Sequence, residues 1–227
     1  MMKRTASIAG LLAALLVAAG IWACAEETQA ELFCEGVISR ETGINFSYHL
    51  PQLMVHSETD KAINESVREL AQTLSKEDET TAVRGSVSFL SPRYVSLELI
   101  SLVQGGGGEH ERLSAVTFAR DGLYTGKQLN LSQILGLEQE EGGESVAKQM
   151  VFDLLWQMIE TEMQNPDNDY PDGLSRTDLE QVFSPEEDFY LDENGNIVFF
   201  IQAGEIAGDI AGILRFPFSS AELLSEM

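Results

Sequence analysis

Positive charge is scarce in this chain, and its shortage excludes one large class of partners. The 227 residues hold 14 Lys and Arg against 37 Asp and Glu, which gives a formal net charge of −23. Affinity for nucleic acids comes largely from Lys and Arg that neutralise phosphates, so we expect no DNA or RNA partner. Such a surface attracts cationic proteins, basic peptides or divalent metals, and the alternative is that the charge only keeps the chain in solution.

Cysteine and histidine are rare as well, which argues against cross-links and metal centres. Cys24 and Cys34 are the two cysteines, too few for a disulfide framework. The histidines, His49, His56 and His110, are too scattered for a zinc site. We therefore predict no metal site and no cofactor.

Known catalytic motifs are missing too. The sequence has no nucleophile-elbow serine, no paired-histidine zinc helix and no phosphate loop with its lysine. The acidic segments 167–172 and 192–196 do not fit the calcium-loop pattern, because the glycine is misplaced and the final bidentate Glu is absent. We predict no catalytic residue.

The start of the chain has the layout of an export signal. Lys3 and Arg4 precede sixteen apolar or glycine residues, 8–23, and small residues continue to Ala25. This run is shorter than the roughly 20 residues of a bilayer span, so a retained membrane anchor is the second choice. We predict that residues 1–25 are a signal peptide and that the rest works outside the cytoplasm.

Cys24 offers another way to hold the chain at a membrane. The sequence Ile21-Trp22-Ala23-Cys24 resembles a bacterial lipobox, which makes Cys24 a candidate for lipid modification. Free secretion and lipid attachment at the outer face of the cell membrane therefore both stay open. Apart from a lipid anchor or a retained signal, no membrane contact is expected.

Hydrophobic periodicity predicts two amphipathic helices, over residues 59–76 and 145–163. Ser57 and Asp60 form a start like a capping box for the first helix. Strands are predicted at 36–40, 44–50, 83–89, 94–103, 113–118, 189–191, 197–201 and 213–218. Hairpin-like links between them predict an α+β fold, with antiparallel sheets packed against the two helices.

The chain after the signal peptide divides into three parts. Residues 26–35 carry Glu and Gln with few apolar positions and are predicted to be a short tether. Residues 36–104 form an N-terminal strand–helix–strand unit. Residues 105–227 form a C-terminal unit that shares one fold with the preceding unit.

Acidic residues are concentrated in the second predicted helix and its flanking loops. Between residues 138 and 193, 17 Asp and Glu stand against Lys148 and Arg176. That concentration is typical of a docking face for a basic partner. A well-solvated outer helix face is the alternative.

The segment after the glycine run 105–108 is the candidate binding site. His110 lies between Glu109 and Glu111, and a glycine-rich loop can approach a partner closely. The alternative is a hydrogen-bonded turn histidine, because one imidazole needs further ligands that the sequence does not place.

Several motifs also occur in a fixed order along most of the chain. They are Tyr48-His49-Leu50-Pro51-Gln52-Leu53, Ala62-Ile63-Asn64, Leu99-Ile100-Ser101-Leu102 followed by Gly107 to His110, Thr125-Gly126-Lys127 with Leu129 and Leu131, and Phe189-Tyr190-Leu191-Asp192 through Phe200 with Glu205-Ile206-Ala207. In this order they resemble the extracellular domain of RsiV-type proteins, the lysozyme-sensing anti-sigma factors. Related domains occur beside peptidoglycan deacetylase domains.

The resemblance implies a fold of two intertwined α+β units and a lysozyme-like partner. It adds Glu205 to Glu109, His110 and Glu111 as candidate binding residues. The chain departs from the family at Glu109 and Glu111, where Ala and Gly are usual, and at residues 203–204, where Pro-Tyr is common.

We therefore expect an exported, non-catalytic binding protein of the cell envelope. It would recognise a cationic, lysozyme-like protein or peptidoglycan through the acidic second helix and the loops around His110 and Glu205. The alternatives are a peptidoglycan-directed hydrolase that uses Glu109, His110 or Glu205, and a structural lipoprotein without a ligand.

Overall fold

The computed structural model of this chain describes residues 32–40, 45–106, 108–137, 143–165 and 168–225. Residues Glu31–Met227 form one compact unit, to which all these segments belong. The predicted signal peptide, Cys24 and residues 26–31 of the predicted tether lie outside the described residues. No helix among the described segments is long and apolar enough to span a membrane.

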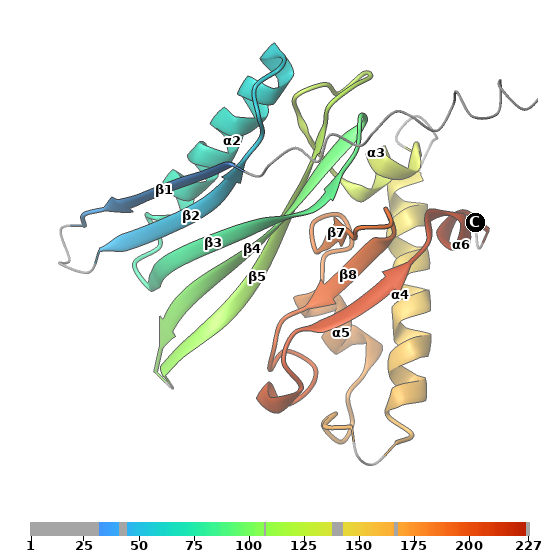
Figure 1. Cartoon of the computed structure of the whole chain (residues 1–227). Coiled ribbons are helices and arrows are strands. Elements are labelled where there is room, and N and C mark those ends of the chain that lie inside the picture. Colours follow the sequence, from blue (N-terminus) through green and yellow to red (C-terminus); the bar gives the residue numbers. More distant parts are fainter. Residues whose placement is uncertain (1–31, 41–44, 107, 138–142, 166–167, 226–227) are drawn as a thin grey trace, which may run out of the picture. The chain divides into compact units, whose positions relative to one another are not determined.

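Six strands form the first sheet, in the order of the chain (Figure 1). They are β1 (Leu32–Ile38), β2 (Phe46–Gln52), β3 (Thr80–Leu90), β4 (Tyr94–Gly105), β5 (Gly108–Ala119) and β6 (Gln128–Leu129). All neighbours are antiparallel except β2 and β3, which pair in parallel. A parallel pair needs a crossover connection, and helix α2 (Glu58–Leu74) provides it.

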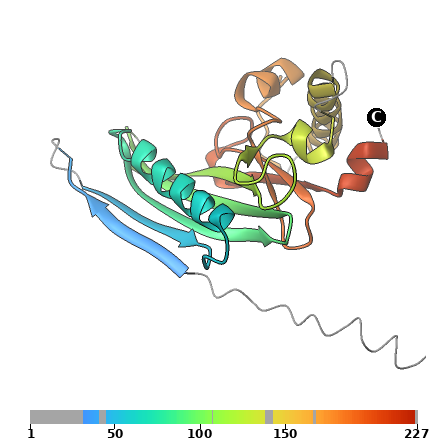
Figure 2. The same ribbon diagram turned by 90° about the horizontal axis from the view of Figure 1, so that it is seen from above.

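Helix α2 lies across one face of this sheet (Figure 2). The side chain of Ser57 caps its start by accepting a hydrogen bond from the Asp60 backbone N–H at 3.1 Å. Ile63, Val67 and Ala71 recur at helical spacing and are almost fully buried against sheet residues such as Phe46, Val95 and Leu99. The apolar stripe read from the sequence therefore faces the sheet, and the predicted first helix is confirmed.

A second sheet contains β7 (Phe189–Leu191), β8 (Ile197–Ile201) and β9 (Leu214–Phe218), all antiparallel, with β8 in the middle. Every residue of β8 is buried. Val198 and Phe200 share a cluster with Leu113 of the first sheet. Ile197, Phe199 and Ile201 belong to the other, larger core. This strand is apolar throughout because both of its faces are covered.

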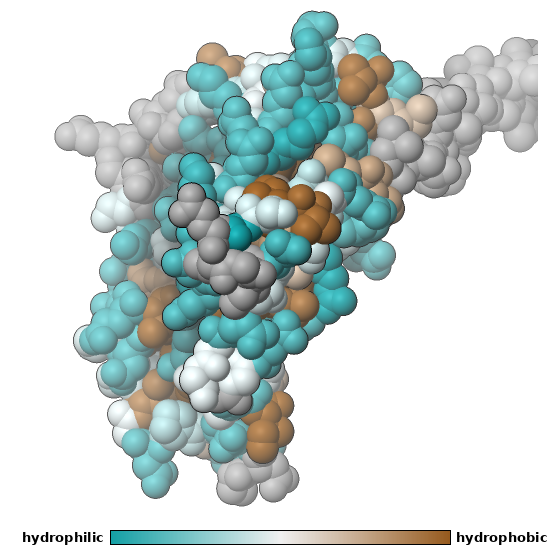
Figure 3. Space-filling model, turned by 90° about the vertical axis from the view of Figure 1, so that its left-hand side faces the viewer, coloured by the Kyte–Doolittle hydropathy of each residue, from teal (hydrophilic) through white to brown (hydrophobic). Residues whose placement is uncertain are grey.

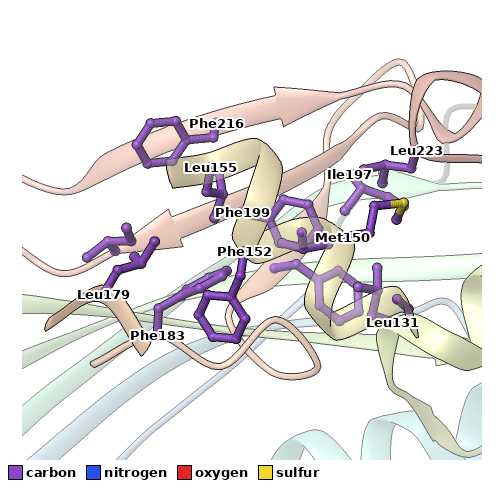
Figure 4. Close-up of a cluster of buried hydrophobic side chains, with 14 of the residues drawn as sticks. Leu131, Met150, Phe152, Leu155, Leu179, Phe183, Ile197, Phe199, Phe216 and Leu223 are labelled. Atoms are coloured by element: carbon purple, nitrogen blue, oxygen red, sulfur yellow. The ribbon is translucent and has the colours of Figure 1, made fainter. Parts of the chain in front are cut away.

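Helices close the larger core on the far side of the second sheet. They are α3 (Leu131–Leu135), α4 (Gly143–Glu162), α5 (Arg176–Val182) and α6 (Ser220–Ser225), with a 3-10 turn η1 (Asp209–Ala211) before β9. Figure 4 shows side chains of α3, α4, α5, β8, β9 and α6 that point toward one another, among them Leu155, Leu179 and Phe199. Leu155, Leu179 and Phe199 have no exposed surface.

A buried hydroxyl pair joins the two sheets. Ser96 of β4 and Thr117 of β5 are hydrogen-bonded at 2.9 Å, and both side chains are almost fully buried. The backbone N–H of Leu191 in β7 donates to the Ser96 hydroxyl at 3.0 Å. The first sheet therefore satisfies a backbone donor of the second, which fixes how the two stack.

The predicted α+β class is confirmed, and three finer expectations are corrected. The sheets are not wholly antiparallel, because α2 returns the chain to pair β3 parallel to β2. Residues 32–35 of the predicted tether are part of β1, since they pair with residues 49–52 of β2. The boundary between residues 104 and 105 falls inside the β4–β5 hairpin, so the first sheet continues across it.

Candidate functional site

The predicted binding residues 109–111 lie in strand β5 and not in a loop. Glu109 pairs with Gln104, His110 with Val103 and Glu111 with Leu102. Gly105 pairs with Gly108 at the end of the ladder, and Gly108 has φ 119°, a conformation that favours glycine. The sequence located the hairpin tip, but the flanking residues extend the ladder because they have backbone partners on β4.

Alternation along β5 sends these side chains to opposite faces of the sheet. Glu109 and Glu111 share one face, where Glu109 accepts from the Thr81 hydroxyl at 3.5 Å and Glu111 pairs with Arg84 at 2.5 Å. His110 is on the other face. Glu109 and His110 therefore lie on opposite faces of the sheet, and all three predicted residues are exposed.

The outer edge of β5 is the most distinctive feature of this region. Leu113 donates its backbone N–H to Gln202 Oε1 at 3.0 Å and accepts from Gln202 Nε2 at 2.7 Å. Backbone groups of alternate residues point to the same side of a strand, so those of Glu109 and Glu111 point outward as well. Strand β6 pairs only with Thr117 and Phe118 on this side, leaving the segment before Leu113 without a neighbouring strand.

We call the outward N–H and C=O groups of Glu109 and Glu111 the open β5 edge. Gln202 terminates this edge, because its carboxamide imitates the donor and acceptor of a further strand at Leu113. No hydrogen bond joins the outward groups of Glu109 and Glu111 to any residue in the described ranges. An unpaired edge of this kind is a template for another extended chain.

Glu205 and Asp188 are two further carboxylates near this edge, and both have a raised pKa. Burial raises the pKa of Glu205, although the Gln202 backbone N–H and the charge of Arg112 act in the opposite direction. Burial also raises the pKa of Asp188, to about 6, with the charges of Glu205 and Glu187 adding to it and a Ser184 hydrogen bond opposing it. Predicted Glu205 is thus within electrostatic range of Arg112 and Asp188.

A pocket of about 480 Å³ lies on the face of the sheet opposite Glu109 and Glu111. Its walls come from the end of α2, the turn before β3, and strands β4 and β5: Leu74, Glu77, Asp78, Glu79, Thr80, Ser101, Val103, Arg112 and Ser114. None of the four predicted residues lines it, although His110 pairs with Val103. Sequence reasoning missed this pocket, because its polar residues are far apart in the chain.

The acidic docking face predicted on the second helix is partly neutralised. Asp153 of α4 forms an ion pair with Arg176, which also binds Glu180 at 2.8 Å. Glu160 and Glu162 are exposed. A groove of about 540 Å³ runs along α4 between Ser145 and Gln157, lined by this one helix. Predicted acidic residues between 138 and 142 lie outside the described part of the chain.

Metal-ligand clusters and broad apolar patches are the other features that could mark a site on the described part of the surface. Over the described ranges, no group of three or more His, Cys, Asp or Glu residues is arranged to hold a metal ion. One side of the molecule, shown in Figure 3, is mostly hydrophilic, with hydrophobic residues in small separate patches. That side offers no broad apolar surface.

The described part of the chain is thus an α+β unit built from two sheets, with an open strand edge and a polar pocket at one hairpin. No known family model matches the chain, and no curated protein matches it in sequence. A crystal structure of a member of the DUF3298 family from Bacteroides fragilis is similar with a TM-score of 0.47. It is 12% identical, and the match covers 87% of this chain and 99% of that one. The resemblance to RsiV-type domains stays a prediction.

Proposed function

We propose that this chain is an extracytoplasmic, non-catalytic binding protein that pairs the open β5 edge with an extended segment of a cationic protein. The observation that carries the proposal is the pair of outward backbone positions at Glu109 and Glu111, which Gln202 leaves unpaired. Strand addition to a sheet edge gives affinity through main-chain hydrogen bonds and specificity through alternate side chains.

The charged side chains around the edge favour a cationic partner. Glu109, Glu111, Asp188 and Glu205 outnumber the neighbouring cations Arg84 and Arg112. An added strand with Lys or Arg side chains would meet the carboxylates of Glu109 and Glu111, which share one face of the sheet. The formal charge of −23 on the whole chain speeds the encounter with such a partner, and salt weakens this steering.

The same charges disfavour a second copy of this chain as the occupant. Two open β5 edges would bring Glu109 and Glu111 of both copies together, and like charges across strands are destabilising. The motif resemblance makes a lysozyme-like protein the first partner to test, with peptidoglycan as the second. An exported location rests on the signal-like residues 1–25.

The test is the binding of a basic lysozyme by calorimetry, at low and at raised salt. Glu111→Pro removes the outward N–H without removing a bond to β4, because proline is tolerated where the N–H faces solvent. We expect this substitution to abolish binding. Glu111→Gln keeps the N–H but loses the charge, so it should weaken binding only several-fold.

Glu160→Gln is the matched control, because it removes one exposed carboxylate from α4. It should bind lysozyme as the unchanged protein does. Normal binding by Glu111→Pro would exclude the β5 edge as the contact, and a loss with Glu160→Gln alone would place the contact on α4. Failure of the unchanged protein to bind lysozyme or peptidoglycan at low salt would refute the proposed function.

A further inference from the structure

The polar pocket lies on the opposite face of the first sheet from Glu109 and Glu111. It is formed where the end of α2, the turn at residues 77–79 and strands β4 and β5 meet. Its volume of about 480 Å³ is within the range of sites for small molecules, roughly 300–1,000 Å³. A ligand of this size, and not a protein segment, would fill it.

The buried hydroxyl of Ser101 is the first observation that indicates a ligand site in this pocket. Its side chain lines the pocket, although the residue is only 5% exposed. Its hydroxyl makes no hydrogen bond with any residue of the described chain. Ser96, on the same strand, shows the usual solution for a buried hydroxyl, since it bonds both Thr117 and Leu191. The unused hydroxyl of Ser101 is therefore available to an occupant.

Arg112 supplies the charge that fits an anion. It lines the pocket beside Ser114, two residues along on the same face of β5. Within the described segments its guanidinium forms no hydrogen bond or ion pair, and only its longer-range charge acts on Asp188 and Glu205. A free guanidinium binds a carboxylate through two parallel hydrogen bonds, which a hydroxyl nearby can supplement.

The opposite wall carries negative charge. Glu77, Asp78 and Glu79 follow one another in the turn after α2 and all line the pocket. The Thr80 hydroxyl donates to Glu77 at 3.0 Å and so orients its carboxylate. Arg40 donates to the backbone oxygens of Ser75 at 2.7 Å and Asp78 at 3.2 Å, which holds the turn in place.

We propose that this pocket binds a basic amino acid. Its carboxylate lies on Arg112 and the Ser101 hydroxyl, and its ammonium groups lie on the wall of residues 77–79. Three carboxylates against one guanidinium favour a ligand that carries two positive charges and one negative charge. A diamine lacks a partner for Arg112, and an acidic amino acid is repelled by the wall.

The experiment is calorimetric titration of the full chain with L-lysine, cadaverine and L-glutamate. Lysine should bind, cadaverine should bind at least about tenfold more weakly, and glutamate should give no signal. Arg112→Gln should weaken lysine binding at least about tenfold and should not weaken cadaverine binding, because it removes a positive charge that repels the diamine. Ser101→Ala should weaken it several-fold.

Arg93→Gln is the control, because it removes an arginine that stacks on Tyr94 and does not line the pocket. It should bind lysine normally, as should Glu111→Pro, which separates this site from the proposed strand edge. Circular dichroism confirms that each variant is folded. Absence of lysine binding at millimolar concentration overturns the inference, and so does equal binding of lysine by Arg112→Gln.

Discussion

Strands β8 and β5 differ in how completely their edges are paired and their faces are covered. β8 has neighbours on both edges and cover on both faces, so all five of its residues are buried. The first half of β5 has a neighbour on one edge, and its residues from Gly108 to Arg112 are exposed. Stability is therefore concentrated around the second sheet, while the hairpin end of the first sheet keeps unused backbone and side-chain groups.

Phe199→Ala should have the largest effect on stability. Phe199 is fully buried, and its ring lies 5.9 Å from that of Phe218 and 6.0 Å from that of Phe183. Truncation leaves a cavity, so the free energy of unfolding should fall by about 3–5 kcal/mol. Urea denaturation followed by circular dichroism measures it. Leu123→Ala, at a residue 76% exposed, should change little, and equal losses would refute the contrast.

Ser96→Ala should lower the free energy of unfolding by less, about 1–3 kcal/mol. The substitution leaves the Leu191 N–H without its acceptor and the Thr117 hydroxyl without its partner in a buried place. Ser86→Ala on β3 is the control, because that residue is exposed. The same denaturation experiment compares them, and a Ser96→Ala protein as stable as the control would mean that this hydroxyl does not join the sheets.

The free energy of unfolding should depend on pH because of Asp188. Burial raises its pKa to about 6 in the folded protein, above the roughly 3.9 of an unfolded chain. The folded state therefore holds the proton more tightly between these values. The stability that this group contributes is fully present below pH 4 and is lost as the pH rises through 6.

Asp188→Asn tests this directly. The variant should lose less stability than the unchanged protein between pH 4 and pH 7, as measured by urea denaturation across that range. Asp178→Asn is a comparison with the opposite sign, because hydrogen bonds from Ser175 lower the pKa of Asp178. Parallel pH curves for the unchanged protein and Asp188→Asn would contradict the assigned shift.

Glu111→Gln should have the smallest effect on stability. Its ion pair with Arg84 is about half exposed on both sides, and such surface pairs contribute roughly 0–1 kcal/mol. The unfolding free energy should change by less than about 1 kcal/mol. A loss as large as that of Ser96→Ala would show that the hairpin end supports the fold instead of serving a partner.

The elements that the sequence predicted best are those whose pattern is local. The α2 stripe and its Ser57 cap are confirmed, and so is the hairpin between β7 and β8. There Asp192 accepts the backbone N–H groups of Asn194 and Asn196 around Gly195. These patterns lie within a few residues of one another, so no knowledge of the rest of the chain is needed.

What the sequence did not show depends on distant partners. The parallel pairing of β2 with β3 follows from where α2 returns the chain, and the start of β1 is a strand only because β2 lies beside it. The glycine run located the tip of the hairpin between β4 and β5. It could not reveal that Gln202, 89 residues beyond Leu113, ends the open edge, or that Ser101 faces a pocket.

Amide hydrogen exchange at the open β5 edge tests the central claim most directly. In the free protein, the N–H groups of Glu109 and Glu111 should exchange fast, whereas those of His110 and Arg112, which point toward β4, should be protected. Adding a basic lysozyme should slow exchange at Glu109 and Glu111 specifically. Lysozyme binding with unchanged exchange at these two amides would contradict strand addition at β5.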